Sequence, residues 1–225
     1  MIEFFEHNRI KLALHKLKDG KGVPLLLLHG LGECSPNRLP QEYAGWQGAV
    51  HSLDFSGHGL SDHPKGGGYT CEYLMADVDI ALARLGPSTV AGRGLGAYIA
   101  LLIAGAPPHQ VRGAILRDGP GLASGASGSR CIPAEEQASP FAPDPFALAE
   151  LSADMRPPDY AAGFALLAKR HSGLAAPISV CALEHADWLV AVVNALALKL
   201  VGIDTALGLA VCAAETESIP NIRET

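Results

Sequence analysis

The sequence lacks an excess of basic residues: its 17 lysines and arginines are outnumbered by 23 aspartates and glutamates, which gives a formal net charge of -6. A chain of this sign offers no basic patch to nucleic acid or anionic lipid, so we expect neither as a partner. Long hydrophobic runs are also missing, because the longest apolar stretches, around residues 97–106 and 189–193, are too short to span a bilayer. The first residues carry acidic side chains where a signal peptide carries basic ones. The sequence therefore predicts a cytoplasmic protein with no membrane partner.

Paired cysteines and metal-binding motifs are absent as well. The five cysteines are odd in number and widely spaced, and none forms a C-x-x-C pair. This pattern argues against a disulfide framework and a zinc site and favours reduced thiols. There is no H-E-x-x-H motif, and spacing as close as that of Glu184, His185 and Asp187 rarely lets three side chains converge on one ion. We therefore expect neither a metal nor another cofactor.

What the chain does contain is the composition of one globular domain. It has 225 residues, of which 48% are hydrophobic and 18% charged, enough to bury one core but short for two. Segments typical of strands and helices alternate along it, which predicts a mostly parallel sheet covered on both faces by helices. We expect strands at 2–6, 9–16, 23–28, 48–54, 111–116, 177–183 and 206–213, and helices at 69–85, 145–154, 159–171 and 188–201. The first two strands form a predicted hairpin that ends at residues 19–22.

The composition changes after Asp118. Residues 119–145 are rich in glycine, alanine, serine and proline, which is typical of a surface excursion rather than of a sheet. Helical patterns return only at residues 145–154. We therefore predict a single domain over residues 1–225, with residues 119–176 inserted in it as a small lid.

The most informative stretch is residues 88–104, where a short β-branched run passes through three glycines into a segment rich in alanine and leucine. This order predicts a strand, a tight turn and a helix. The frame Gly92-Arg93-Gly94-Leu95-Gly96 has the spacing of the G-x-S-x-G turn that presents a catalytic serine, but glycine stands at the serine position. The predicted turn therefore has no attacking atom at residue 94.

Several motifs occur in the order found in one enzyme family. They are the apolar strand running into His29-Gly30, the turn Asp54-Phe55-Ser56-Gly57-His58-Gly59-Leu60-Ser61, the glycine elbow, and the segment from Val111 to Gly119 that follows it. Together they make residues 23–120 resemble the α/β-hydrolase family. The resemblance implies the α/β-hydrolase fold, with a mostly parallel central sheet flanked by helices and a small lid.

The resemblance also implies where a site should lie. Family members form an oxyanion hole from two backbone amides, which correspond here to Leu31, in the loop after His29-Gly30, and Leu95. Gly94 takes the nucleophile position, and no histidine follows Val190, where the family's catalytic histidine belongs. The implied candidates for the catalytic acid are Glu184, Asp187 and Asp118.

Other polar residues flank the implied site. Arg93 and Glu33 border the expected pocket mouth, where they are candidates to hold a polar ligand or each other, and we favour a salt link between them. His29 and His58 are expected to stabilise turns rather than to catalyse. Cys34 follows the oxyanion loop with no visible base beside it, so we expect an inert thiol.

Three functions follow from these candidates. Without the serine and the histidine, the favoured hypothesis is a protein of hydrolase ancestry that binds a small carbonyl or carboxylate compound, or acts on it non-covalently. In the second, His185 activates a water for hydrolysis beside Glu184 and Asp187. In the third, Gly92-x-Gly94-x-x-Ala97 binds a dinucleotide, with Asp118 on its ribose. The first two imply a small-molecule ligand or substrate, and nothing in the sequence indicates an oligomeric state.

Overall fold

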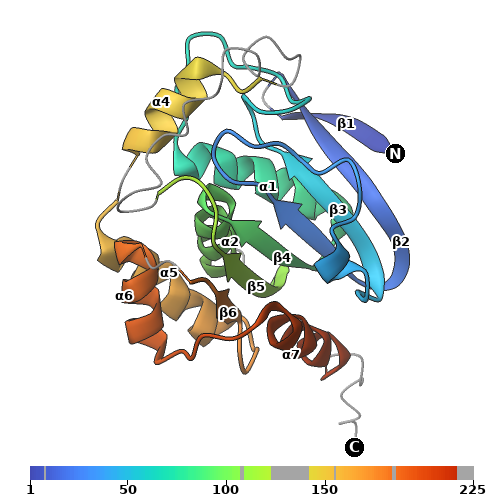
Figure 1. The fold of residues 1–225 in the computed structure, drawn as a ribbon, viewed down its shortest axis with the longest axis vertical. Helices are drawn as coiled ribbons and strands as arrows, with labels where there is room; N and C mark the ends of the chain where they lie inside the picture. Colours follow the sequence, from blue (N-terminus) through green and yellow to red (C-terminus); the bar gives the residue numbers. More distant parts are fainter. Residues whose placement is uncertain (8, 107–108, 123–141, 155, 184–185, 217–225) are drawn as a thin grey trace, which may run out of the picture.

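The chain folds around a central six-stranded sheet in a computed structural model that describes residues 1–7, 9–106, 109–122, 142–154, 156–183 and 186–216 (Figure 1). The strand order is β1-β2-β4-β5-β6, and β3 pairs with β2. The strands are β1 (Ile2–His7), β2 (Ile10–Leu28), β3 (Gly48–Asp54), β4 (Ser88–Arg93), β5 (Val111–Arg117) and β6 (Ile178–Cys181). The helices are η1 (Gln41–Tyr43), α1 (Cys71–Leu85), α2 (Leu95–Gly105), α4 (Pro145–Ala153), α5 (Pro158–His171), α6 (Asp187–Leu196) and α7 (Ile203–Thr216). The expected α/β class is confirmed.

Strand β2 contains two of the predicted strands, residues 9–16 and 23–28. Its first part pairs antiparallel with β1, which forms the predicted hairpin. The chain reverses at residues 19–22, because His51 of β3 pairs with Lys16 before this stretch and with Leu26 after it. Gly22 lies opposite Gly48 at the start of β3, where two residues without side chains let the backbones approach. The predicted end of the first hairpin at residues 19–22 therefore coincides with the reversal of the chain, although the strand label continues through it.

The remaining pairs, β2 with β4, β4 with β5 and β5 with β6, are parallel, as predicted. Side chains on these strands alternate between two cores. Leu26 and Leu28 pack in the core that contains the buried residues of α1 and α2. Leu25 and Leu27 pack in a second core on the opposite face, because successive side chains of a strand point to opposite faces. Burial on both faces explains why this strand is an unbroken apolar run.

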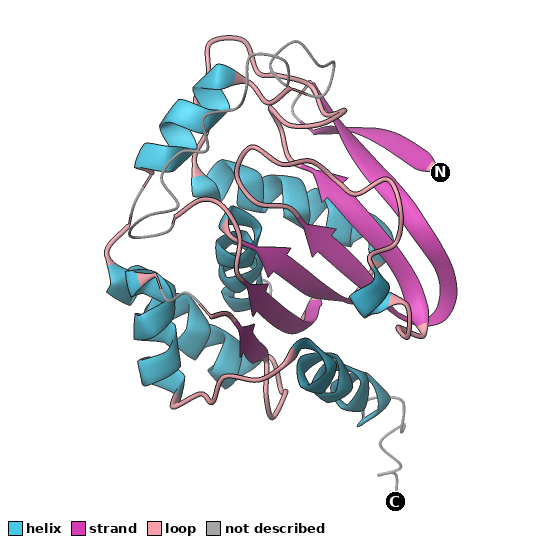
Figure 2. Cartoon of the chain, in the orientation of Figure 1, coloured by secondary structure: helices cyan, strands magenta, loops and turns pink. Residues whose placement is uncertain are grey.

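Helices cover both faces of the sheet (Figure 2). Helices α1, α2 and α5 supply buried residues to the first core, and α7 supplies Ala206 and Ala210 to the second. The sequence predicts a strand at Ala206–Ala213, and this prediction is wrong, since those residues belong to α7. Burial of two alanines four residues apart is the spacing of a helix, which a short apolar run alone does not reveal. The predicted helix at 188–201 ends early, at Leu196, because Ala197 adopts a left-handed conformation with φ of 50°.

The two helices predicted within residues 119–176 are present as α4 and α5. Carboxylates of the α4 segment hold it against the loop before α1. Glu150 accepts hydrogen bonds of 2.7 Å from the amides of Gly68 and Tyr69. The Tyr69 hydroxyl donates to Asp144 at 2.7 Å, and Asp144 also caps the first turn of α4. Among the described residues, no helix has both the length and the apolar character needed to cross a membrane.

Candidate ligand site at the glycine elbow

The turn between β4 and α2 is the centre of the candidate site. Gly94 joins the end of the strand to the start of the helix, with φ of 54° and ψ of -120°. A positive φ costs glycine little, whereas a residue with a side chain is strained there. The Gly94 amide donates to the carbonyl of Arg117 at 3.1 Å, which fixes the turn against the end of β5. The predicted strand, tight turn and helix are confirmed.

Two backbone amides point at one oxygen above this turn. The amide of Leu31, in the loop after β2, donates to the Pro120 carbonyl at 3.0 Å. The amide of Leu95, in the first turn of α2, donates to the same oxygen at 2.9 Å. Two donors on one acceptor is the arrangement that an oxyanion hole needs. In this structure the chain's own Pro120 carbonyl occupies the position in front of these amides.

Two buried histidines brace the loops around the amides. His29 donates from Nδ1 to the Gly30 carbonyl at 2.8 Å, since its Nε2 accepts from the Phe55 amide at 3.1 Å. His58 accepts from the Gly32 amide at its Nε2, at 3.3 Å. Burial lowers the pKa of both, and the pKa of His58 falls to about 3. Both rings are therefore neutral and occupied with loop contacts, which agrees with the expected turn-stabilising role.

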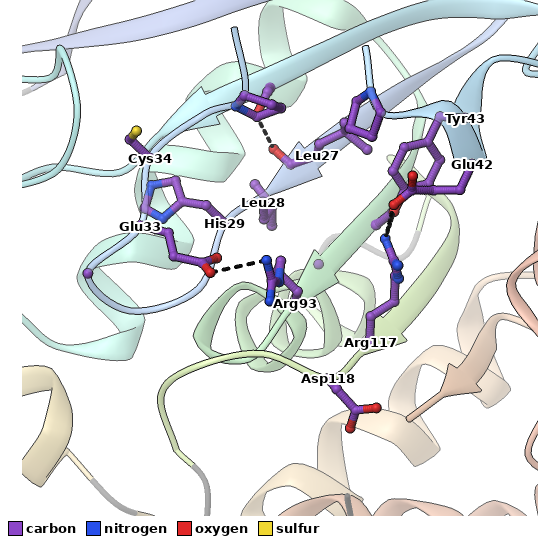
Figure 3. Close-up of a pocket in the computed structure, with 16 residues that line it drawn as sticks. Leu27, Leu28, His29, Glu33, Cys34, Glu42, Tyr43, Arg93, Arg117 and Asp118 are labelled. Carbon is purple, nitrogen blue, oxygen red and sulfur yellow. Dashed lines mark hydrogen bonds and ion pairs between the residues drawn. The ribbon is translucent and has the colours of Figure 1, made fainter. Parts of the chain in front are cut away.

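A cavity of about 660 Å³ lies beside the elbow, at the carboxyl ends of β2, β4 and β5 (Figure 3). Its apolar lining includes Leu27 and Ala91, on the face of the sheet that carries the second core. Its polar lining consists chiefly of Glu33, Glu42, Tyr43, Arg93, Arg117 and Asp118. Clefts outside the carboxyl ends of parallel strands are where α/β proteins commonly bind ligands.

Two ion pairs line this cavity. Arg93 lies 3.1 Å from Glu33, which confirms the expected salt link, and its side chain is 49% exposed. Arg117 donates to Glu42 at 2.8 Å and to the Tyr43 hydroxyl at 2.9 Å. Burial raises the pKa of Glu42, but hydrogen bonds and the Arg117 charge outweigh it and hold that pKa below its usual value.

Sequence reasoning misses Arg117, Glu42 and Tyr43. A signal for Arg117 exists, because it ends a parallel strand and lies in register with Arg93 on the neighbouring strand. Glu42 and Tyr43 belong to the 3-10 turn η1 in a loop with no recognisable motif, so their place at the cavity follows only from the three-dimensional fold.

The predicted acids have separate roles. Asp118 accepts a hydrogen bond of 2.6 Å from the Leu183 amide, and Asp187 is the first residue of α6. Glu184 and His185 lie outside the described residues. Burial raises the pKa of Cys34, which favours the protonated thiol and agrees with an inert residue. Among the residues that the structure describes, no three metal-binding side chains are placed to hold an ion.

The dinucleotide interpretation needs free amides at the start of α2 to hold a phosphate. The Leu95 amide is bonded to Pro120 instead, and Asp118 is bonded to the Leu183 amide. In this arrangement, neither the phosphate nor the ribose of a dinucleotide has its expected partner. The geometry therefore does not favour dinucleotide binding at the elbow.

Comparison with known proteins places these features in context. The family described as the alpha/beta hydrolase fold matches residues 23–174. A curated relative, (E)-2-((N-methylformamido)methylene)succinate hydrolase of Acinetobacter baylyi, is 31% identical over 100 residues. That alignment covers 44% of this chain and 38% of the relative, so the chain matches well under half of the relative's length.

Two solved structures share the fold over most of the chain. The thioesterase domain from the curacin biosynthetic pathway has a TM-score of 0.63 at 15% identity, covering 96% of this chain and 98% of that chain. N-formylmaleamic acid deformylase from Pseudomonas putida S16 also has a TM-score of 0.63, at 16% identity, covering 87% of this chain and 88% of that chain. At such low identity the likeness concerns the fold alone.

Proposed function

Because the chain belongs to the α/β-hydrolase fold family, we propose that it binds a small carbonyl or carboxylate compound without forming a covalent acyl intermediate. The observation that carries this function is the convergence of the Leu31 and Leu95 amides on one carbonyl oxygen, at a turn where Gly94 has no side chain. A covalent intermediate needs an attacking oxygen, sulfur or nitrogen, and residue 94 supplies none. What remains is a pair of donors suited to a carbonyl or carboxylate oxygen.

The neighbouring cavity favours a carboxylate. Arg93 and Arg117 line it, and a guanidinium binds a carboxylate through two parallel hydrogen bonds. Arg93 is the more accessible of the two, since its side chain is half exposed and Arg117 already donates to two partners. The name of the curated relative also contains a succinate, which carries two carboxylates. We therefore infer that Arg93 holds a carboxylate of the ligand.

Titration calorimetry with succinate tests this function. We expect saturable binding by the wild-type protein and, in Arg93→Met, an affinity lower by about tenfold or more, because a charge-assisted hydrogen bond contributes roughly 1.5–3 kcal/mol. Arg38→Met is the matched control, since Arg38 is an exposed arginine that does not line the cavity. A serine-directed phosphonate should label none of these proteins.

Two outcomes contradict a non-covalent binding site. Absence of succinate binding, or equal weakening by both arginine variants, would show that the cavity does not recognise a carboxylate through Arg93. Turnover of an activated ester that disappears in His185→Ala would replace binding with water-mediated hydrolysis.

A further inference from the structure

Residues 118–122, which we call the strap, cross over the elbow and are fixed at three points. Asp118 accepts a hydrogen bond of 2.6 Å from the Leu183 amide at one end. The Leu122 carbonyl accepts from the Trp188 indole nitrogen at 3.2 Å at the other end. Between these ends, the Pro120 carbonyl accepts from the two amides of the candidate site. The strap therefore presents one backbone carbonyl to the donors that would hold a ligand.

The strap and the elbow fit together because two residues lack side chains. A Cβ atom at Gly94 would lie 2.1 Å from the Pro120 oxygen, far inside van der Waals contact. A Cβ atom at Gly121, whose φ is 95°, would lie 2.7 Å from the Leu31 Cβ and 3.0 Å from the Leu95 Cβ. The glycine that removes the nucleophile is thus the same residue that makes room for the strap.

We infer that the strap is an internal competitor for the candidate site: the Pro120 carbonyl fills the amide pair in the resting protein, and a ligand binds by displacing it. This regulation rests on the proposed function, because it concerns the same two amides. A ligand that binds only the open state has an apparent affinity reduced by the fraction of molecules that are open. Changes that loosen the strap should therefore strengthen ligand binding.

Two strap contacts can be altered without touching the cavity. Gly121→Ala places a methyl group against Leu31 and Leu95, which should lift the strap from the amides. Trp188→Phe removes the hydrogen bond to Leu122 and keeps an aromatic ring beside Tyr98, 5.1 Å from centroid to centroid. Trp46→Phe is the matched control, since it also removes an indole hydrogen bond to a backbone carbonyl, that of Val23, outside the strap.

Hydrogen exchange of the Leu31 amide, followed by NMR, reports the strap without any ligand. Leu31 is only partly buried, so protection of its amide depends on the Pro120 carbonyl rather than on burial alone. We expect exchange about three- to tenfold faster in Gly121→Ala and Trp188→Phe, the effect of losing about one hydrogen bond, and no change in Trp46→Phe. The affinity for succinate should rise by a similar factor in the two strap variants.

The two readouts separate the inference from the proposed function. Equal Leu31 exchange in all four proteins, or unchanged succinate affinity in strap variants that exchange faster, would overturn the strap as a competitor and leave binding by the wild-type protein intact. Absence of succinate binding in every protein would overturn the proposed function itself, whatever the exchange rates. If Gly121→Ala fails to fold, Trp188→Phe still decides the outcome.

Discussion

His58, a buried residue near the elbow, makes the stability of the fold depend on pH. His58 accepts a hydrogen bond from the Gly32 amide and is fully buried. Its ring centroid lies 5.0 Å from that of His29. Burial lowers the pKa of His58 to about 3, and the neighbouring His29 ring adds to this shift. The unfolded chain takes up this proton near pH 6.5, so the His58 contribution to stability is complete above pH 6.5 and is lost as the pH falls toward 3.

His58→Ala tests this residue. We expect a loss of about 1–3 kcal/mol in the free energy of unfolding at pH 7, because the Gly32 amide loses its partner. Between pH 6.5 and 4 the free energy of unfolding should fall less steeply in the variant than in the wild type, by up to about 1.4 kcal/mol per pH unit. Urea unfolding across this pH range measures both effects. His63→Ala, at an exposed position, should match the wild type, and a variant slope equal to the wild-type slope would show that His58 is not buried in its neutral form.

At the candidate site, sequence reasoning succeeds where one local motif determines the backbone. The turn at Gly94 follows from a strand-turn-helix pattern of a few residues, and the resemblance to the α/β-hydrolase family implies the Leu31 and Leu95 amides. The position of the Pro120 carbonyl cannot be predicted in this way, because it reaches the amides only through the pairing of β5 with β4. Filling of the site by the chain itself is thus a property of tertiary structure.

At the scale of elements, the same reasoning succeeds for segments with a clear period and fails for short apolar runs. The leucine run 25–28 is a strand because residues on both faces pack against helices or loops. The run at 206–213, rich in alanine and leucine, is also apolar but forms part of a helix. The two runs differ in the surface against which they pack. Ala210 packs over Gly113 of β5, where a Cβ atom added to Gly113 would lie 3.8 Å from the Ala210 Cβ.

Helix α7 provides an element-scale prediction. Ala206→Glu should lower the free energy of unfolding by about 2–4 kcal/mol, because it forces a charge into the second core, where Ala206 is fully buried. Thr205→Glu is the control on the preceding residue of the same helix, and because that side chain is exposed, the substitution should change stability by no more than about 0.5 kcal/mol. Chemical denaturation followed by circular dichroism measures both. Equal effects of the two substitutions would show that α7 does not pack through Ala206.

At the scale of the whole molecule, carboxylates join the inserted segment to the sheet domain. Glu150 holds two amides before α1, and Asp154, just after α4, accepts from the Cys71 amide at the start of α1, at 2.6 Å. Arg156 extends these contacts to Glu72 at 2.8 Å. Because the contacts connect α4 to the first turn of α1, we propose that the insertion and the sheet form one cooperative unit within a single domain.

Glu150→Ala tests whether the insertion and the sheet unfold together. Loss of two hydrogen bonds to a carboxylate should cost roughly 1–3 kcal/mol, which for a chain of this size lowers the melting temperature by about 2–12 °C. Since α4 also buries Ala147 and Leu151 in the first core, we expect calorimetry to show one transition at the lower temperature rather than two. Asp159→Ala, at an exposed acid of α5, is the control and should change the melting temperature little. A separate early transition in Glu150→Ala alone would show that α4 unfolds independently and that the insertion is a subdomain of its own.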